Sequence, residues 1–332
     1  YKKKVTLKDI ALKASVSTTT VSVILNGRKD VQIGEEARQR VLDAAAELGY
    51  TFTIPSKAKE APVLCFVHSD VMEMNIGTSF LVRVASQRRS LCEAAGLIVQ
   101  ESEFNPSRAL SYYQAVIASR PRMIVSFDNK FTKLHGSQKN DIPLFSLQGD
   151  REQLDSSVKR SLYLVDDSLV GEQGALHLLD KGYRSCGLVF PEIKGRCETE
   201  RSSSFIKIFE KGGGKVRHVM LPFKDHLLIE QWFREWAGLE FDSFYFFSDA
   251  MALPGLRGLQ VQGRRIPDDV AVLGTDNLYW GRFTYPSLTT MDLHEDRFAG
   301  KIFTEIKSYL SGEPFYSGET VIPVDLICRE ST

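Results

Sequence analysis

Residues 5–50 read VTLKDIALKASVSTTTVSVILNGRKDVQIGEEARQRVLDAAAELGY, and this stretch decides the fold of the amino-terminal part of the chain. Apolar residues recur in it at helical spacing in three runs: Leu7, Ile10, Ala11 and Ala14, then Val21, Ile24 and Leu25, then Val41, Leu42, Ala45 and Leu48. Ser15-Val16-Ser17 breaks the first run, and Ser17 stands where the second helix needs an N-cap. Three short helices with a tight turn between the first two predict a helix-turn-helix DNA reader.

The alternative is an ordinary three-helix bundle without a ligand. The polar surface of the second helix favours the DNA reader, because its short hydrogen-bonding side chains can approach a groove. The residues that we predict to contact DNA are Thr6, Ser17, Thr18, Thr19, Thr20, Ser22, Val23, Asn26, Arg28 and Tyr50.

The chain is neutral overall, but its charge is unevenly spread. Residues 1–59 hold eleven lysines and arginines against six aspartates and glutamates, a net charge of +5, so the rest of the chain carries −5. A basic head on an acidic body is typical of a phosphate-binding module joined to a domain that does not bind nucleic acid. Because the excess is modest, we expect two heads on a homodimer to bind DNA together.

The sequence lacks the patterns that accompany catalysis. Its five cysteines are scattered without C-x-x-C spacing, which predicts neither a disulfide framework nor a metal site. It contains no G-x-S-x-G, no phosphate-binding G-x-x-x-x-G-K-[ST] and no metal-binding histidine pair. We therefore expect no enzyme activity, no catalytic residue, no metal and no cofactor. No signal peptide opens the chain and no apolar run reaches membrane-spanning length, so we expect a cytoplasmic protein without a membrane partner.

The remaining chain alternates short apolar runs with longer helical patterns. Strands are predicted at 63–67, 97–99, 123–127, 186–190, 243–247 and 270–273. Helices are predicted at about 80–95, 107–119, 168–181, 201–211, 226–237, 250–262 and 295–311. Repeated units of this kind predict an α/β protein with parallel sheets covered by helices, and their number indicates more than one sheet.

Ligands of such folds lie at the carboxyl ends of the strands. The polar residues expected there are His68-Ser69-Asp70, Asp128-Asn129, Ser248-Asp249 and Thr275-Asp276-Asn277. Each of these has a second interpretation, because Asp and Ser after a strand commonly cap the next helix. Sequence position alone leaves both interpretations open.

Specific motifs resemble the lactose/galactose-repressor family of bacterial transcription regulators. In the head they are VTLKDIA, VSTTTVS, LNG and AAAELGY, and in the body KGYRSCGLVF, FSDAMALPGLRGLQVQGRRIPDDVAVLGTDN, YPSLTTMD and CRES. The resemblance implies a three-helix helix-turn-helix headpiece followed by a two-lobed body like the periplasmic sugar-binding proteins. It implies a headpiece at 1–50, a linker at 51–61 and an effector-binding and dimerisation domain at 62–332, with one lobe at 62–163 and 292–322 and the other at 164–291 and 323–332.

The resemblance also implies where an effector binds. Arg201, in ETERSSSF, matches an arginine that precedes a helix, and Asp276, in GTDN, matches an acidic residue that accepts hydrogen bonds from the ligand. An arginine and a carboxylate suit a neutral sugar and do not exclude a purine. Gln148, Cys197 and Ser248 stand at family contact positions with different side chains. The aromatic residues predicted either to stack on a sugar or to belong to the core are Phe80, Phe223, Tyr279 and Trp280.

Two features of the DNA-reading part depart from the family. The linker TFTIPSKAKEA, residues 51–61, lacks the leucine with which relatives wedge the minor groove, and Pro55 lies inside the expected hinge helix, so we expect a flexible tether or a hinge that forms poorly on DNA. Val23 follows V-S in T-V-S-x, where relatives often read a base, and valine can contact only a thymine methyl. The alternative is that Val23 packs inside the headpiece.

Together these features predict a homodimeric bacterial transcriptional regulator, in function a repressor, that binds an inverted-repeat double-stranded DNA operator at the nucleoid. A small effector, a sugar by preference, controls its DNA affinity. The alternative is a co-regulator of the same fold that responds to a partner protein docked on the first lobe.

Overall fold

The computed structural model describes residues 6–25, 33–48, 63–69, 80–138, 140–151, 158–192, 195–223, 225–235 and 240–332. Its helices are α1 (Leu7–Ala14), α2 (Thr18–Leu25), α3 (Glu35–Glu47), α4 (Phe80–Ala94), α5 (Ala109–Ala118), α6 (Asn129–Ser137), α7 (Asp167–Asp180), α8 (Arg196–Lys211), α9 (His226–Glu235), α10 (Asp249–Val261) and α11 (Glu295–Leu310), with 3₁₀ turns η2 (Pro106–Arg108) and η3 (Tyr279–Arg282). None of the described helices is long and apolar enough to span a membrane.

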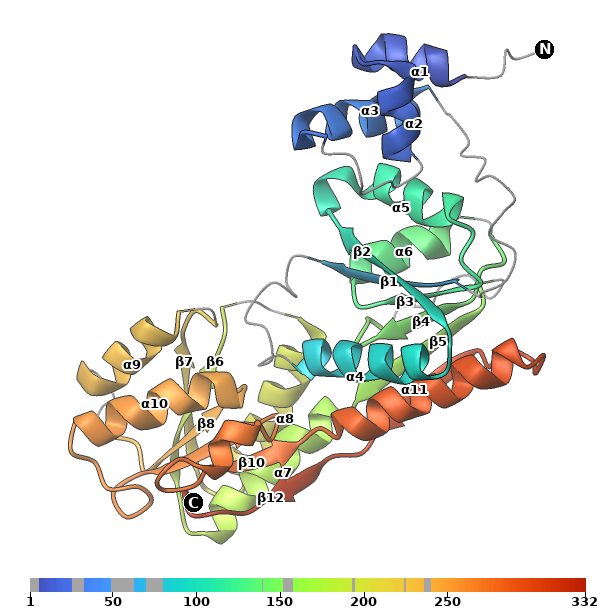
Figure 1. Cartoon of the computed structure of the whole chain (residues 1–332). Coiled ribbons are helices and arrows are strands. Elements are labelled where there is room, and N and C mark those ends of the chain that lie inside the picture. The colour runs from blue at the N-terminus through green and yellow to red at the C-terminus, as the bar shows by residue number, and fades with distance from the viewer. Residues whose placement is uncertain are drawn as a thin grey trace. The chain divides into compact units, whose positions relative to one another are not determined.

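The first three helices form the predicted headpiece (Figure 1). Thr6 and Asp9 form a capping box at the start of α1. Ser15 ends this helix in the left-handed conformation, with its backbone N–H bonded back to Ala11. The headpiece core contains Ile10, Ala11, Ala14, Val21, Ile24, Val41, Ala44 and Ala45, in agreement with the predicted apolar faces.

The described residues beyond the headpiece form two six-stranded sheets. The strands of the first are β1 (Val63–Ser69), β2 (Ile98–Phe104), β3 (Met123–Ser126), β4 (Leu144–Leu147), β5 (Arg160–Val165) and β11 (Gly318–Ile322), in the order β11-β5-β4-β3-β1-β2. The strands of the second are β6 (Ser185–Phe190), β7 (Lys215–Met220), β8 (Ser243–Phe246), β9 (Ala271–Thr275), β10 (Thr289–Asp292) and β12 (Asp325–Ile327), in the order β12-β10-β9-β8-β6-β7.

Strand pairing in these sheets is mainly parallel. β1 runs parallel to β2 and β3, β5 to β11, and β6 to both β7 and β8. β12 is the exception, because it runs antiparallel to β10. The α/β class with helix-covered parallel sheets is therefore confirmed, with one antiparallel edge strand.

The chain divides into two compact units, one made of residues 1–70, 92–145 and 153–160 and the other of residues 71–91, 146–152 and 161–332. The boundary falls inside β4. This division differs from the headpiece, linker and two lobes expected from the sequence, and that expected division stays a proposal. All residues predicted to bind the effector belong to the second unit.

Several predicted elements begin or end elsewhere. The helix expected from residue 201 starts five residues earlier, at Arg196, because the Glu198 side chain accepts a hydrogen bond from the backbone N–H of Gly195 and caps the first turn. The expectation that Arg201 precedes this helix was therefore wrong, since it lies on the second turn of α8. The sequence patterns also missed α6, β4, β5, β7 and β10–β12.

Close packing of α7 and α8 depends on Gly171 (Figure 1). A Cβ at this position would lie 2.2 Å from the backbone oxygen of Arg201 and 2.9 Å from the backbone nitrogen of Phe205. Only glycine lets the two helix backbones approach this closely. The contact holds the α8 turn that carries Arg201 against the first turns of α7.

We predict that Gly171→Ala destabilises the protein by about 1–3 kcal/mol or more, because neither backbone can move without repacking the second unit. Gly300→Ala is the matched control, since a Cβ there meets nothing within 4 Å. This control should leave stability unchanged or raise it by about 0.5–1 kcal/mol. Urea unfolding of both variants measures the difference, and equal stability of the two would contradict the packing role of Gly171.

Candidate functional site

Helix α2, which we predict to read DNA, is capped as the sequence predicts. The Ser17 hydroxyl accepts a hydrogen bond from the Thr20 backbone N–H at 3.0 Å, and the two hydroxyl oxygens lie 2.8 Å apart. Thr18 and Thr19 are exposed, and Ser22 is half-buried. The first turn of α2 therefore presents short polar side chains to solvent, as approach to a groove requires.

The remaining predicted DNA contacts are placed less favourably or lie outside the described residues. The Thr6 hydroxyl donates to the Asp9 carboxylate at 2.6 Å and serves as a cap. Val23 is only 7 % exposed, which favours packing within the protein over contact with a thymine methyl. Asn26, Arg28, Tyr50 and the linker 51–61 lie outside the described residues.

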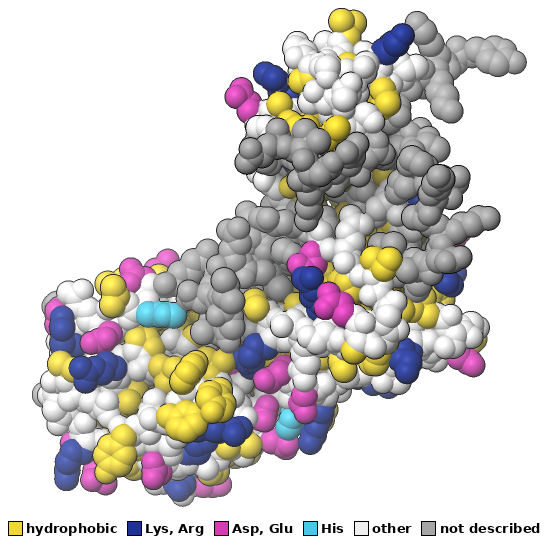
Figure 2. All heavy atoms as spheres, viewed as in Figure 1, with side chains coloured by type: hydrophobic (Ala, Val, Ile, Leu, Met, Phe, Trp, Pro, Cys, Tyr) yellow, Lys and Arg dark blue, Asp and Glu magenta, His cyan; other side chains and the backbone are white. Residues whose placement is uncertain are grey.

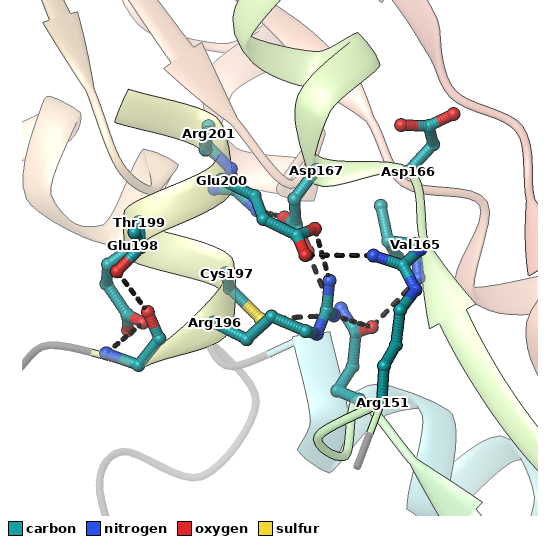
Figure 3. Close-up of polar contacts among 12 residues, drawn as sticks. Arg151, Val165, Asp166, Asp167, Arg196, Cys197, Glu198, Thr199, Glu200 and Arg201 are labelled. Atoms are coloured by element: carbon teal, nitrogen blue, oxygen red, sulfur yellow. Dashed lines mark hydrogen bonds and ion pairs between the residues drawn. The ribbon is translucent and has the colours of Figure 1, made fainter. Parts of the chain in front are cut away.

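A buried carboxylate, Asp167 at the start of α7, is the centre of the candidate effector site (Figure 3). Its side chain is fully buried, and one oxygen accepts a hydrogen bond from Nη2 of Arg201 at 2.6 Å. The other oxygen accepts from Nη2 of Arg196 at 3.2 Å. Both arginines come from α8, so one carboxylate holds two cations in a place from which water is largely excluded.

Arg201 is held on two further sides. Its Nη1 donates to the backbone oxygen of Phe247 at 2.7 Å, and its guanidinium carbon lies 4.6 Å from the centroid of the Phe247 ring. Arg201 is the residue predicted to bind the effector, and both of its terminal nitrogens thus already donate to protein atoms. Each of these nitrogens keeps one further N–H, so an effector would bind an arginine whose position Asp167 and Phe247 already fix.

Arg196 connects this centre to Gln148, which follows β4. Nη2 of Arg196 donates to Oε1 of Gln148 at 3.0 Å, and the same amide oxygen accepts from the backbone N–H of Val165. The other terminal nitrogen of Arg196 bonds Glu200 at 2.7 Å, and Arg151 pairs with Glu200 at 2.8 Å. Gln148 therefore accepts hydrogen bonds within this site, and its own φ of 52° lies in the left-handed region.

Two donors in the described part of the site have no partner. These are the Nε atoms of Arg196 and Arg201, both inaccessible to solvent. Their side chains are 9 % and 3 % exposed. A buried donor without an acceptor is costly, so an oxygen-bearing ligand that reached these two atoms would gain by satisfying them.

Asp276 lies at the carboxyl end of β9 in a strained and desolvated position. Its φ is 109°, unusual for a residue with a side chain, and it is 6 % exposed. Its backbone oxygen accepts a hydrogen bond from Nη2 of Arg83 at 2.8 Å. Burial raises the pKa of the Asp276 carboxyl to about 7, although Arg83 and Arg201 favour its charged form.

Two of the other predicted ligands have structural partners. The hydroxyl of Ser248 caps α10 by accepting from the Met251 backbone N–H at 3.4 Å, which favours the capping interpretation of this strand end. The Asp128 carboxylate caps α6 in the same way, at 2.8 Å from the backbone nitrogen of Phe131. Cys197 lies beside the charged centre, with its sulfur 3.7 Å from Nη2 of Arg196, and burial raises its pKa.

The predicted aromatic contacts separate into two groups. Phe80 is buried against Phe298 in an edge-to-face arrangement, and Phe223 packs against the Phe247 ring, which favours the core interpretation for both. Tyr279 and Trp280 are 62 % and 66 % exposed. They lie on the segment between β9 and β10.

Sequence reasoning missed Asp167, Arg196 and Arg83. Asp167 follows another acid at a helix start and therefore looks like a helix-capping residue. Arg196 is five residues from Arg201, between the strand predicted at 186–190 and the helix predicted at 201–211. A second arginine so close to the first was the available signal. Among the described residues, no group of three His, Cys, Asp or Glu side chains could hold a metal ion.

The chain matches two protein families. Residues 6–52 match the bacterial regulatory proteins of the lacI family, and residues 175–332 match a periplasmic binding protein-like domain. Among curated relatives, the HTH-type transcriptional regulator DegA of Bacillus subtilis (strain 168) is 22 % identical over 99 % of this chain and 98 % of its own length. The HTH-type transcriptional repressor PurR of Actinobacillus pleuropneumoniae serotype 3 (strain JL03) is 23 % identical over 89 % of this chain and 88 % of its own.

Solved structures of similar fold include a complex of the transcriptional regulator CelR with cellobiose and the Lac repressor bound to ONPG in the repressed state. Each has a TM-score of 0.68 and 19 % identity, and each match covers 99 % of this chain and 100 % of the other. The predicted two-part fold is therefore confirmed.

The raised pKa of Asp276 predicts a pH effect on stability. In the unfolded chain the carboxyl loses its proton near pH 3.8, but the folded protein keeps it until about pH 7. Stability that this group contributes below pH 4 is therefore lost as the pH rises to 7, by about 1.4 kcal/mol for each pKa unit of difference. Asp276→Asn should gain stability relative to the wild type across this interval.

Denaturant unfolding of both proteins at pH 4.5, 6 and 8 measures the gap between them. The gap should widen in favour of the asparagine variant up to about pH 7 and then stay constant. Part of this gap reflects Asp249, because beyond the effect of burial the charge of Asp276 raises the pKa of this second buried carboxyl. A gap independent of pH would contradict the desolvated state of Asp276.

Proposed function

We propose that a sugar controls the affinity of this protein for operator DNA. The premise is that the chain belongs to the LacI family of bacterial regulatory proteins. The chain is a DNA-binding transcriptional regulator with a small-molecule effector, and we assign it the role of a cytoplasmic repressor without catalytic activity. Sugar complexes among its structural neighbours support a sugar as the effector class.

The observation that carries the effector proposal is the pair of unpartnered donors beside Asp167. Sugar hydroxyl oxygens can accept hydrogen bonds from the buried Nε atoms of Arg196 and Arg201. Asp276 can accept from another hydroxyl once it is ionised. We propose that these three residues, with Gln148 and Cys197 beside them, recognise the effector.

The experiment that tests this function has a DNA arm and an effector arm. Selection from a random duplex library should yield an inverted repeat, and Thr18→Ala and Thr19→Ala should each weaken binding to it by about 1–3 kcal/mol if the hydroxyl reads a base. A thermal-shift screen with sugars and purines should then find a stabilising ligand, by about 2.7 kcal/mol at one hundred times its Kd.

The ligand found should alter operator affinity, and Arg201→Ala should remove this response while operator binding persists. A response of Arg201→Ala at the wild-type ligand concentration would contradict the site. No shift with any sugar or purine, together with a shift on adding a phosphocarrier protein, would favour the partner-protein alternative. Failure to select any DNA sequence would contradict the regulator itself.

The exposed aromatic residues between β9 and β10 support a homodimer. Tyr279, Trp280, Phe283 and Tyr285 are 62–87 % exposed, and the Tyr279 ring lies 5.0 Å from that of Phe283. Figure 2 shows apolar side chains gathered on the visible face of the second unit. Contiguous aromatic surface of this kind is typical of a protein interface. We propose that a second copy of the chain covers it.

Sedimentation of the wild type at micromolar concentration without DNA should give a dimer, and Phe283→Asp should shift it towards monomer by placing a charge inside the interface. Leu176→Asp is the control, because Leu176 is an exposed apolar residue of α7, 44 % accessible, outside this aromatic segment. A monomeric wild type, or a dimer equally weakened by both substitutions, would overturn the assignment.

A further inference from the structure

The strand β7 ends the second sheet on one side. It pairs in parallel with β6 from Lys215 to Met220, and no strand of the described chain follows it in the sheet order (Figure 1). Such an edge presents backbone donors and acceptors that another strand can pair with. Neither the effector site nor the aromatic segment involves this strand.

The hydrogen bonds to β6 show which backbone groups face outward. The N–H of Lys215 donates to the oxygen of Arg184, and the N–H of Leu221 donates to the oxygen of Phe190. Because backbone groups alternate sides along a strand, positions 217 and 219 also face β6. The N–H and C=O groups of Val216, His218 and Met220 therefore point away from the sheet.

A hollow lies along each face of this strand. One, of about 250 Å³, is bounded by α8 residues such as Thr199 and Ser202. The other, of about 450 Å³, is bounded by Trp232 of α9 and by Phe241. His218 and Met220 line both hollows, and Met220 is 44 % exposed.

We propose that the free edge of β7 binds an extended acidic segment of a partner protein, which adds to the sheet as a further strand. Main-chain hydrogen bonds to Val216, His218 and Met220 would supply affinity, and the two hollows would receive side chains that alternate along the added strand. The proposal concerns a surface separate from the effector site and does not depend on it.

The charges of β7 decide the kind of occupant. Its ionisable side chains are Lys215, Arg217 and His218, and all three are basic. Glu240 pairs with Arg217, but both side chains are more than half exposed, and such surface pairs are weak and readily exchanged. Glu198 is committed to the cap of α8. Acidic residues are therefore the favoured cross-strand neighbours.

The same charges argue against a second copy of β7 as the occupant. Antiparallel pairing of two such strands through their outward-facing groups, centred on position 217, would place Arg217 opposite Arg217. Like charges directly opposite each other destabilise a strand pair.

The first test uses the full chain and a fluorescein-labelled peptide, acetyl-Glu-Leu-Glu-Val-Glu-Leu-Glu-amide. The wild type should bind it, and the double substitution Lys215→Glu with Arg217→Glu should weaken binding at least tenfold. Lys301→Glu with Lys307→Glu, on α11, makes the same change of net charge and should have little effect. No binding by the wild type, or an equal loss in both double variants, would overturn the proposal.

The second test separates strand addition from attraction between charges. His218→Pro removes an outward N–H without touching the bonds to β6, and His218→Ala removes the same imidazole but keeps the N–H. The proline variant should bind the peptide at least tenfold more weakly than the alanine variant, while both retain wild-type melting temperatures and operator binding.

Equal peptide affinity of these two variants would show that the backbone edge is not used. Self-association of the wild type that His218→Pro alone abolishes would show that a second copy occupies the edge instead. If His218→Pro melts at a lower temperature, a peptide N-methylated at alternate residues replaces it. Of the two such peptides, methylated at the odd-numbered or at the even-numbered residues, only one should then lose binding to the wild type.

Discussion

One buried carboxylate, Asp167, holds together the part of the protein in which an effector is expected to bind. Two arginines of α8 converge on it, and burying either charge at 3–9 % exposure without a partner would be strongly destabilising. Asp167 sits at the first turn of α7, where the helix dipole favours a negative charge. The pairing of Asp167 with the two arginines therefore also holds the start of α7 against α8.

This arrangement changes what the predicted effector residue can do. Arg201 was expected to offer a free fork to a ligand, but its terminal nitrogens bond Asp167 and the oxygen of Phe247. Its Nε is buried without a partner, and Arg196 supplies a second such donor. A ligand would thus complete an existing charged centre. It would also contact Arg196. Because Arg196 bonds Gln148, the position of the Arg196 side chain depends on the position of the segment after β4.

Several polar residues at strand ends serve the fold, although their position suits a ligand equally well. Ser248 and Asp128 accept hydrogen bonds from the first turns of α10 and α6, where backbone donors lack partners within the helix. Asp276 differs from them, because its carboxyl is desolvated and its backbone is held in an unfavourable conformation by Arg83 and by a bond to Met291. Strain and desolvation at one residue are typical of a functional position.

The sequence by itself determined the headpiece, most of the helices of the body and about half of its strands, because these depend on apolar periodicity and on caps only a few residues away. Ser17 at the start of α2 and the run from Phe80 to Ala94 are examples. The tertiary structure alone decided what Arg201 bonds, since Asp167 lies 34 positions earlier in the chain. It also decided that Ser248 caps a helix, that Val23 is buried and that β7 lies at the edge of the second sheet as far as the chain is described. Such properties depend on which segments become neighbours, and no local pattern of side chains encodes them.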